Sequence, residues 1–425
     1  MLSEKNFWNS TVEPASRPDA AVPSRVDVAI VGGGYAGLSA ARVLARSGAR
    51  VAVLEQETVG WGASSRNAGM VLTGMKLGPE ALVKKYGEAR ARRMFAFSLS
   101  AIDTVERIVN EERIACGFVR SGHLEAAWKP AHFAGYAAAA EFMEKTFGHR
   151  VQVIPKADLH AEIGSDLYHG GMVDEVSASV NHKQFVLGLA DAARRAGALI
   201  HEQTRVRSVG RAAGRFTVAT DRGTIDAERV FVGTGGYTGP ATPALRRRVI
   251  PIGSYIIASA PLSDALARQV IPRRRMVFDS KHFLYYFRLT PDNRMLFGGR
   301  AAFRPETPMS TRRSAEILRQ GMVQVFPQLS ATPVEFVWGG RVDFTYDVMP
   351  HAGVLDDLYY AIGFGGHGVA IATSLGESVA RQMLGQAADH PLVGLPFPAV
   401  PLYNGNPLVH LPAAWMYYKV LDWVS

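Results

Sequence analysis

The stretch from Val26 to Glu55 most constrains what this chain can fold into. It contains a short apolar run, three spaced glycines, a helical pattern, a second apolar run and a terminal acid, in that order. The glycines are Gly32, Gly34 and Gly37. In a strand–helix–strand unit they allow a tight turn, a close approach of the backbone to a pyrophosphate, and close packing of the helix on the strands. The stretch therefore predicts a parallel α/β unit that binds a dinucleotide at the start of its helix.

The terminal acid narrows the choice of dinucleotide. Glu55 follows Gly37 by 18 residues. A carboxylate in this place accepts hydrogen bonds from a ribose diol and repels a 2′-phosphate, which favours FAD or NAD over NADP. The next segment, GWGASSRNAGM from Gly60 to Met70, is rich in small and hydroxyl side chains. It suits a backbone lying close against a flat ligand, and the alternative interpretation is an ordinary Gly/Ser loop.

A second glycine-rich helix start lies near the far end of the chain. Residues 358–369, LYYAIGFGGHGV, read as a short strand, a glycine-rich turn and the first residues of a helix. Backbone amides and the positive dipole end of such a helix suit the O2/N1 edge of an isoalloxazine, which becomes anionic on reduction. Two glycine-rich helix starts at opposite ends of the chain favour FAD, because FAD is long enough to need both.

Five motifs together carry a family resemblance. They are GGGYAG (Gly32–Gly37), GWGASSRNAG (Gly60–Gly69), HFLYYFRLTPDNRMLFGGRA (His282–Ala301), WGGRVDFTYDVMPHAG (Trp338–Gly353) and GFGGHGVAIATSLGE (Gly363–Glu377). The chain thereby resembles the D-amino-acid oxidase (DAO) superfamily of FAD-dependent amine oxidoreductases, alongside glycine oxidase and monomeric sarcosine oxidase. Within it, the chain is most similar to the gamma-glutamylputrescine oxidase branch.

The resemblance implies an α/β fold of the glutathione-reductase type 2, with a Rossmann-like FAD-binding domain and an inserted, β-sheet-rich substrate domain. The expected FAD-binding domain covers residues 25–78, 150–240 and 335–390, and the substrate domain covers 79–149 and 241–334. Residues 391–425 are expected to form a tail that packs on the body. Periodicity predicts helices over 79–114, over 131–147 and from the Asn181 cap to Arg195. Residues 249–300 are mostly β and would form a sheet roofing the flavin.

We predict that FAD is held without a covalent bond. Some relatives tether it through a cysteine in the stretch matching Gly340–Thr345, which has none here, and Cys116 lies in the wrong part of the chain. The resemblance also places Val206 at the adenine and the loop around Thr234 near the pyrophosphate or flavin. The predicted cofactor-binding residues are Gly32, Gly34, Tyr35, Ala36, Gly37, Glu55, Gln56, Gly62, Ala63, Ser64, Ser65, Arg66, Asn67, Val206, Thr234, Gly235, Gly339, Gly365, Gly366, His367, Gly368 and Val369.

The implied reaction is oxidation of a small primary or secondary amine by transfer of a hydride equivalent to flavin N5, followed by hydrolysis of the imine. It requires a neutral amine, an orienting pocket and stabilisation of the reduced ring, but no nucleophile and no metal. The electron acceptor is O2, which would yield H2O2, or a carrier. Sarcosine-oxidase relatives carry an oxygen-activating lysine where this chain has Leu296 or Phe297, so the acceptor stays open. The predicted catalytic residues are Tyr255, His282, Tyr285, Arg288 and His367.

The expected substrate depends on which of two side chains of one predicted strand faces the flavin. Tyr285 and Arg288 cannot both face the flavin on a regular strand, because Arg288 shares its face with Tyr286 and Leu284. An inward Tyr285 makes an aromatic, uncharged pocket for a polyamine derivative or a bulkier secondary amine. An inward Arg288 would bind the carboxylate of a D-amino acid or an N-methyl amino acid. The resemblance favours the first arrangement.

Composition sets further limits. With 425 residues, 48% hydrophobic and 9% aromatic, the chain can bury the cores of two domains. The net charge of +9 includes Arg246–Arg248 and Arg273–Arg275, which lack the interleaved aromatics of a nucleic-acid site and are interpreted as solvated surface. The single cysteine excludes an intramolecular disulfide. No apolar run reaches the length of a membrane span and no signal-peptide core opens the chain, so a cytoplasmic enzyme is expected.

Two other functions remain open from the sequence. The chain could be a flavoprotein subunit of a multi-subunit dehydrogenase, since the family contains such assemblies, and its oligomeric state is not predicted. An NAD-linked dehydrogenase is the second alternative, but it leaves the glycine-rich element at Gly363–Val369 without a role, and no second complete GxGxxG unit is present.

Overall fold

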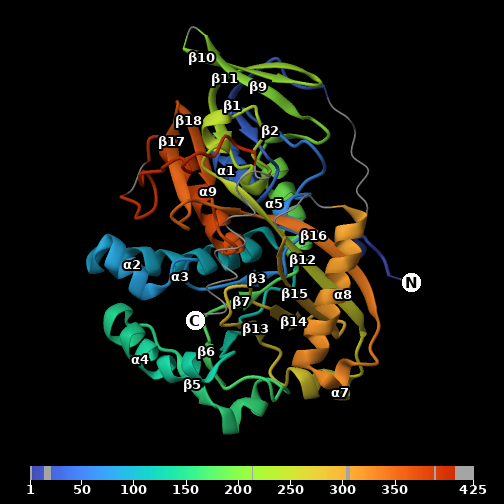
Figure 1. The fold of residues 1–425 in the computed structure, drawn as a ribbon. Coiled ribbons are helices and arrows are strands. Elements are labelled where there is room, and N and C mark those ends of the chain that lie inside the picture. The colour runs from blue at the N-terminus through green and yellow to red at the C-terminus, as the bar shows by residue number, and fades with distance from the viewer. Residues whose placement is uncertain (1, 14–20, 213, 303–306, 387–388, 407–425) are drawn as a thin grey trace.

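The computed structural model describes residues 2–13, 21–212, 214–302, 307–386 and 389–406. Its first sheet has eight strands. They are β1 (Arg25–Val31), β2 (Val51–Leu54), β8 (Leu199–His201), β9 (Val206–Ala212), β10 (Arg215–Thr220), β11 (Gly223–Val232), β17 (His351–Leu355) and β18 (Leu358–Ile362). Their order is β17–β18–β11–β1–β2–β8, and the β9–β10 hairpin extends from β11 (Figure 1).

The centre of the first sheet is parallel and buried on both faces. β1 pairs in parallel with β2 and with β11, and all four residues of β2 are buried. Strands of this kind read as continuous apolar runs, because helices cover the sheet. The helices on one face are α1 (Tyr35–Arg46), α3 (Glu88–Glu112), α5 (His182–Arg195) and α9 (Gly368–Met383). The α/β fold predicted from the dinucleotide fingerprint is confirmed.

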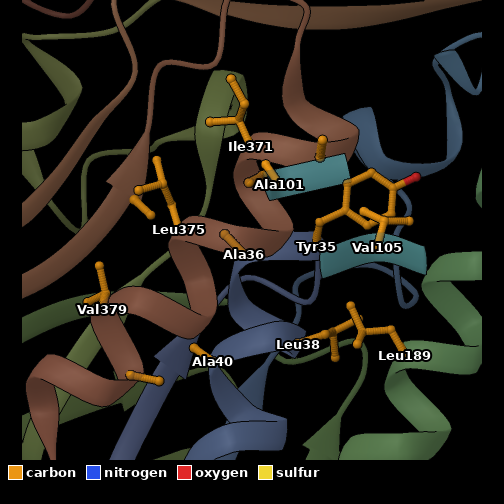
Figure 2. Packing of buried hydrophobic residues seen from close by; sticks show 14 of the residues in the cluster. Tyr35, Ala36, Leu38, Ala40, Ala101, Val105, Leu189, Ile371, Leu375 and Val379 are labelled. Carbon is orange, nitrogen blue, oxygen red and sulfur yellow. The ribbon is translucent and has the colours of Figure 1, made fainter. Parts of the chain in front are cut away.

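Helices α1 and α9 lie in close contact although they come from opposite ends of the chain. Figure 2 shows Ala36 and Ala40 of α1 facing Leu375 and Val379 of α9. A Cβ at Gly376 would lie 2.3 Å from the backbone oxygen of Ala36, so only glycine permits this crossing. The contact brings the two glycine-rich helix starts toward the same region.

The second sheet also has eight strands, most of them antiparallel. They are β4 (His123–Ala126), β5 (Gln152–Pro155), β6 (Gly170–Asp174), β12 (Ile250–Pro261), β13 (Met276–Asp279), β14 (Tyr286–Leu289), β15 (Arg294–Ala302) and β16 (Val334–Phe344), in the order β16–β12–β15–β14–β13–β4–β6–β5. Helix α8 (Pro308–Val325) covers its outer face, with α7 (Asp264–Val270) at one end (Figure 1). A short ladder of β3 (Met70–Val71) and β7 (Ala178–Ser179) forms a third sheet.

The remaining helices are α2 (Pro79–Tyr86), α4 (Pro130–Phe147) and α6 (Pro243–Arg246). The helical conformation predicted over 79–114 is confirmed, but it is divided into two helices. Gly87, at φ +77°, separates α2 from α3, and a residue with that backbone angle cannot continue a right-handed helix. The predicted C-terminal end of α4 and the predicted N-terminal cap of α5 are confirmed. Gly148 ends α4 in the left-handed conformation, and the Asn181 side chain accepts a hydrogen bond from the Gln184 amide at 3.1 Å.

Three strands and one helix lie with a different sheet from the one that the expected domain ranges imply. β5, β6 and β16 belong to the second sheet, although residues 150–240 and 335–390 were assigned to the FAD-binding domain. Conversely, α3 packs in the core of the first sheet, although residues 79–149 were assigned to the substrate domain. The aromatic segment at 411–425, expected to pack on the body, lies outside the described residues. Of the helices that are described, none has both the length and the apolar character needed to cross a membrane.

An ion-pair network ties α3 to the dinucleotide unit. The Arg42 guanidinium of α1 contacts Glu111 at 2.6 Å and Glu112 at 2.7 Å, both on α3. It also contacts Glu377 of α9 at 3.1 Å. The Arg42 side chain is only 2% exposed, so these contacts replace its hydration. The network holds three helices in fixed positions around the first sheet.

Candidate functional site

A large cavity is lined by residues of both sheets. Its volume is 1420 Å³, whereas pockets for drug-sized ligands have volumes of about 300–1,000 Å³. Its walls include the β1–α1 turn, the loop around Ser64, one face of α4, strand β12 and the turn before α9. The cavity therefore has room for a dinucleotide together with a small substrate.

One end of the cavity is built from the dinucleotide fingerprint. Gly32 adopts φ +105°, which allows the tight turn from β1 to α1. Glu55 directly follows β2 and accepts hydrogen bonds from the Gly33 amide at 2.7 Å and from the Glu57 amide at 2.9 Å. Burial raises the pKa of Glu55, and these two donors oppose that shift. They hold the carboxylate at the cavity wall, where it can receive ribose hydroxyls.

The loop after β2 is held by side-chain hydrogen bonds to α1, to its own backbone and to β16. The Ser64 hydroxyl accepts a hydrogen bond from the Tyr35 amide at 3.2 Å, and the Tyr35 hydroxyl donates to the Ser64 carbonyl at 2.7 Å. The Arg66 guanidinium donates to the Trp61 carbonyl at 2.8 Å and to the Gly339 carbonyl at 2.9 Å. Arg66 therefore fastens this loop to β16 of the second sheet, at the border between the two sheets.

The second helix start reaches the same cavity. The buried Asp343 carboxylate accepts a hydrogen bond from the Gly363 amide at 2.7 Å and so holds the turn before α9. Burial raises the pKa of Asp343 to about 6. Burial also lowers the pKa of His367 to about 4, so its imidazole is neutral at pH 7. Its Nδ1 atom is buried without a hydrogen-bond partner among the described residues.

These features fit FAD. No side chain caps α1 or α9, and the Ala36, Gly368 and Val369 amides have no acceptor within the described part of the chain. Uncapped amides at a helix start bind anionic groups. The predicted cofactor-binding residues that line the cavity are Gly32, Gly34, Tyr35, Ala36, Glu55, Gln56, Gly62, Ala63, Ser64, Arg66, Asn67, Val206, Thr234, Gly235, Gly365, Gly366, His367, Gly368 and Val369.

Three predicted cofactor residues do not line the cavity. Gly37 lies where α1 crosses β1, and a Cβ there would come within 2.1 Å of the Gly32 carbonyl oxygen. The buried Ser65 hydroxyl donates to the Gly60 carbonyl, and the Gly339 carbonyl receives Arg66. Their assignment as ligand contacts is corrected, because each shapes the backbone around the cavity instead.

The predicted substrate residues are placed differently from expectation. His282 and His367 line the cavity, whereas Tyr255, Tyr285 and Arg288 do not. Tyr255 is 2% exposed and packs under α8, where its hydroxyl lies 3.1 Å from that of Ser310. Tyr285 packs on the outer side of the second sheet, with the Lys281 ammonium 3.5 Å from its ring centre. The expectation of an inward Tyr285 is therefore wrong, and Tyr286 lines the cavity in its place.

Arg288 shares a face with Tyr286, as predicted, but lies deeper than the cavity wall. Its guanidinium donates to the Ala68 carbonyl at 2.6 Å and to the Val180 carbonyl at 2.9 Å. Burial lowers its pKa to about 10. Arg288 therefore joins three backbone segments, and it does not line the cavity.

Substituting Arg288 by methionine is expected to lower the free energy of unfolding by about 2–3 kcal/mol, because charged donors to two buried carbonyls are lost. Turnover should fall by the same factor for amines with and without a carboxylate. Urea unfolding and parallel kinetics on both substrate types check this. Arg288→Lys, which keeps one charged donor, should recover part of the stability. A loss confined to carboxylate-bearing substrates would instead place Arg288 at the substrate.

Several cavity residues escaped the sequence analysis. They include Lys76, His123, Glu125, Tyr136, Ser254 and Tyr286. His123 and Glu125 stand two residues apart in β4, whose other members, Leu124 and Ala126, are apolar, and this alternation is a usable signal in the sequence. No comparable pattern marks Lys76, which lies in an irregular loop, or Tyr136, whose place depends on how α4 packs.

Comparison with known proteins identifies the family of this chain. The family model for FAD-dependent oxidoreductases, DAO, matches residues 27–382. The chain belongs to the DAO family of FAD-dependent oxidoreductases. It is 32% identical to the probable oxidoreductase OrdL of Haemophilus influenzae over 425 residues, which cover 98% of this chain and 96% of that protein. It is 31% identical to gamma-glutamylputrescine oxidoreductase of Escherichia coli, over 85% of this chain and 84% of that protein.

Solved structures show the same DAO fold. Glycine oxidase from Geobacillus kaustophilus superposes with a TM-score of 0.76 at 22% identity, covering 89% of this chain and 99% of that one. The family predicted from the five motifs is confirmed, and with it the dependence on FAD. When bound, FAD supplies the acceptor for a hydride equivalent.

Proposed function

We propose that this DAO-family protein oxidises a small primary or secondary amine to an imine, which water then hydrolyses. In that reaction the carbon beside nitrogen loses a hydride equivalent to FAD and the nitrogen loses a proton. Hydrolysis of the imine completes an oxidative deamination or an N-dealkylation. The relatives named for gamma-glutamylputrescine and for glycine support an amine or amino acid as substrate.

The observation that carries the choice of an amine is the charge of the cavity away from the nucleotide. The arginines among its described lining residues come from the nucleotide end or the sheet border: Arg66, Arg205, Arg246 and Arg341. The opposite end contains the Glu125 carboxylate among aromatic and apolar walls such as Phe278 and Met172. This arrangement favours a cationic ligand over one held by an arginine fork.

A second candidate substrate is a D-amino acid or an N-methyl amino acid. It is favoured by Lys76, whose ammonium could receive a carboxylate because the side chain lines the cavity. The electron acceptor is O2 or a carrier. Leu296 and Phe297, at the place of the oxygen-activating lysine in relatives, are buried and apolar. Formation of H2O2 during turnover separates the two acceptors.

The experiment that tests the proposal starts from the visible spectrum of the purified protein. We expect flavin bands, with FAD released into the supernatant on acid precipitation if it is noncovalently held. Anaerobic mixing with amines, D-amino acids and N-methyl amino acids should then bleach the flavin. Reduction by a 2-hydroxy acid but by no amine would contradict the proposal. Size-exclusion chromatography with an activity assay on the peak tests whether the chain acts alone or needs further subunits.

A further inference from the structure

Glu125 is set into the wall of the cavity by strand pairing. It lies on β4, opposite Phe278 of β13 and Met172 of β6. Successive side chains of a strand point to opposite faces, so His123 and Glu125 face one way and Leu124 and Ala126 the other. Leu124 and Ala126 are fully buried in the core of the second sheet, whereas His123 and Glu125 line the cavity. The backbone therefore fixes the direction of the Glu125 carboxylate.

The carboxylate of Glu125 is only partly satisfied by the protein. The hydroxyl of Tyr136, on α4, donates to Oε1 at 3.3 Å. No donor to Oε2, and no cationic group within ion-pair distance, occurs in the described ranges of the chain. The surrounding protein raises the pKa of Glu125 by desolvation. A carboxylate in such a place is stabilised by any cation that enters the cavity.

The other acidic residues that line the cavity have different roles. Glu55 stands at the nucleotide end and Asp343 holds the turn before α9. Asp174 accepts from the Thr73 hydroxyl at 2.7 Å and contacts His149 Nε2 at 2.8 Å. The last two are Glu57, which accepts from Gln56, and Glu80, which is exposed on α2. Glu125 is thus the acid that faces the deep end of the cavity with an open oxygen.

Lys76 forms no ion pair with Glu125 in the described part of the chain, but the two charges interact at longer range, and each opposes the effect of desolvation on the pKa of the other. The Lys76 side chain lies against the turn before α9. A Cβ added at Gly365 in that turn would be 3.0 Å from the Cβ of Lys76. The Lys76 residue is exposed, but its exposed surface forms part of the cavity wall. Desolvation by the surrounding protein lowers the pKa of its ammonium group. No carboxylate of a described residue lies within ion-pair distance of it. The cavity therefore presents one negative and one positive group, both available to a ligand.

Building on the proposed function, we propose that Glu125, held by Tyr136, binds an ammonium group of the substrate that is distant from the carbon being oxidised. The nitrogen that is oxidised must be neutral, because a protonated amine has no lone pair to assist loss of the hydride equivalent. A nitrogen bound to a carboxylate is held in its protonated form. The nitrogen at Glu125 is therefore a second one, and the substrate carries two.

Two kinds of substrate carry such an ammonium group, and Glu125 would bind it in the same way in both. It can be the far end of an aliphatic diamine, or it can belong to an amino-acid group at the far end of a longer amine. In the second case the neighbouring carboxylate would be available to Lys76.

The test uses the FAD-loaded enzyme and substrates matched in length. An aliphatic diamine and the monoamine of the same chain length differ only in the distant ammonium. We expect the wild type to prefer the diamine. Glu125→Gln should lower that ratio of kcat/KM on the order of 100-fold, mainly through KM, because a partly buried ion pair is lost. Glu141→Gln removes an exposed carboxylate of α4 that pairs with Lys145, and it should leave the ratio unchanged.

A second variant and a second ligand series complete the test. Tyr136→Phe should lower the same ratio in the same direction, by a factor of roughly 5–10 for one lost hydrogen bond. If Glu125→Gln does not retain flavin, Tyr136→Phe provides the test in its place. The second series compares an amine bearing an α-amino acid end with its methyl ester. A loss of preference for the acid in Lys76→Met assigns the ammonium to an amino-acid group, and no change assigns it to a diamine.

Two negative results have different meanings. Equal losses for the diamine and the monoamine in both variants, with no effect in the α-amino acid series, would overturn the assignment of Glu125 as an ammonium site. Failure of every amine to reduce the flavin of the wild type would instead contradict the proposed function itself.

Discussion

Gly37→Ala is expected to produce a protein that is purified without bound FAD and is destabilised by about 3 kcal/mol or more. The added Cβ would lie 2.1 Å from the backbone oxygen of Gly32 and 3.1 Å from Cγ2 of Ile30. A backbone oxygen in the turn cannot move aside as a flexible side chain can, so α1 must shift away from β1. That shift displaces the amides at the helix start that would face the pyrophosphate.

The measurements are the ratio of flavin to protein after purification and urea unfolding of the apoprotein. Gly135→Ala is the matched control, because Gly135 is also helical and a Cβ there would meet nothing within 4 Å. It should keep FAD and gain about 0.5–1 kcal/mol from helix propensity. If the two variants bind FAD equally well, the close contact between α1 and β1 is not what makes Gly37 necessary.

Arg42→Met is the second substitution with a large expected effect. The Arg42 side chain is 2% exposed, and the Glu377 and Glu112 side chains are 6% and 7% exposed. Removing one member of a buried ion network costs about 3–5 kcal/mol, since the remaining charges lose their partner but stay dehydrated. We expect about 3 kcal/mol, the lower end. Glu112 keeps contacts with Arg46 and Arg195, and Glu377 keeps contacts with Arg107 and Arg381.

Thermal and urea unfolding of the apoprotein measure this loss. Arg50→Met is the control, since Arg50 pairs with Asp27 at 2.7 Å in an exposed position. Water hydrates that pair in both states, so the midpoint should hardly move. A similar small shift for Arg42→Met would mean that α3 is held on the first sheet by apolar packing alone.

The FAD end of the site was predictable because its physics is local. The turn at Gly32, the acid at Glu55 and the helix start at Gly368 each follow from a few neighbouring residues. The substrate end was not predictable in the same way. Arg288 belongs to the short strand β14 and Tyr285 directly precedes that strand, and their side chains point to opposite faces as predicted. Which face of that strand meets the cavity depends on α8, which covers the face that carries Tyr285.

By itself, the sequence determined the dinucleotide unit, the two glycine-rich helix starts and the family, because glycine spacing and apolar periodicity report the backbone directly. Only the tertiary structure decided what the cavity contains at its far end. Glu125, Tyr136 and Lys76 come from β4, α4 and an irregular loop, and no sequence spacing relates them. Their meeting depends on how the second sheet and α4 pack around the cavity, and packing brings together residues that are distant in sequence.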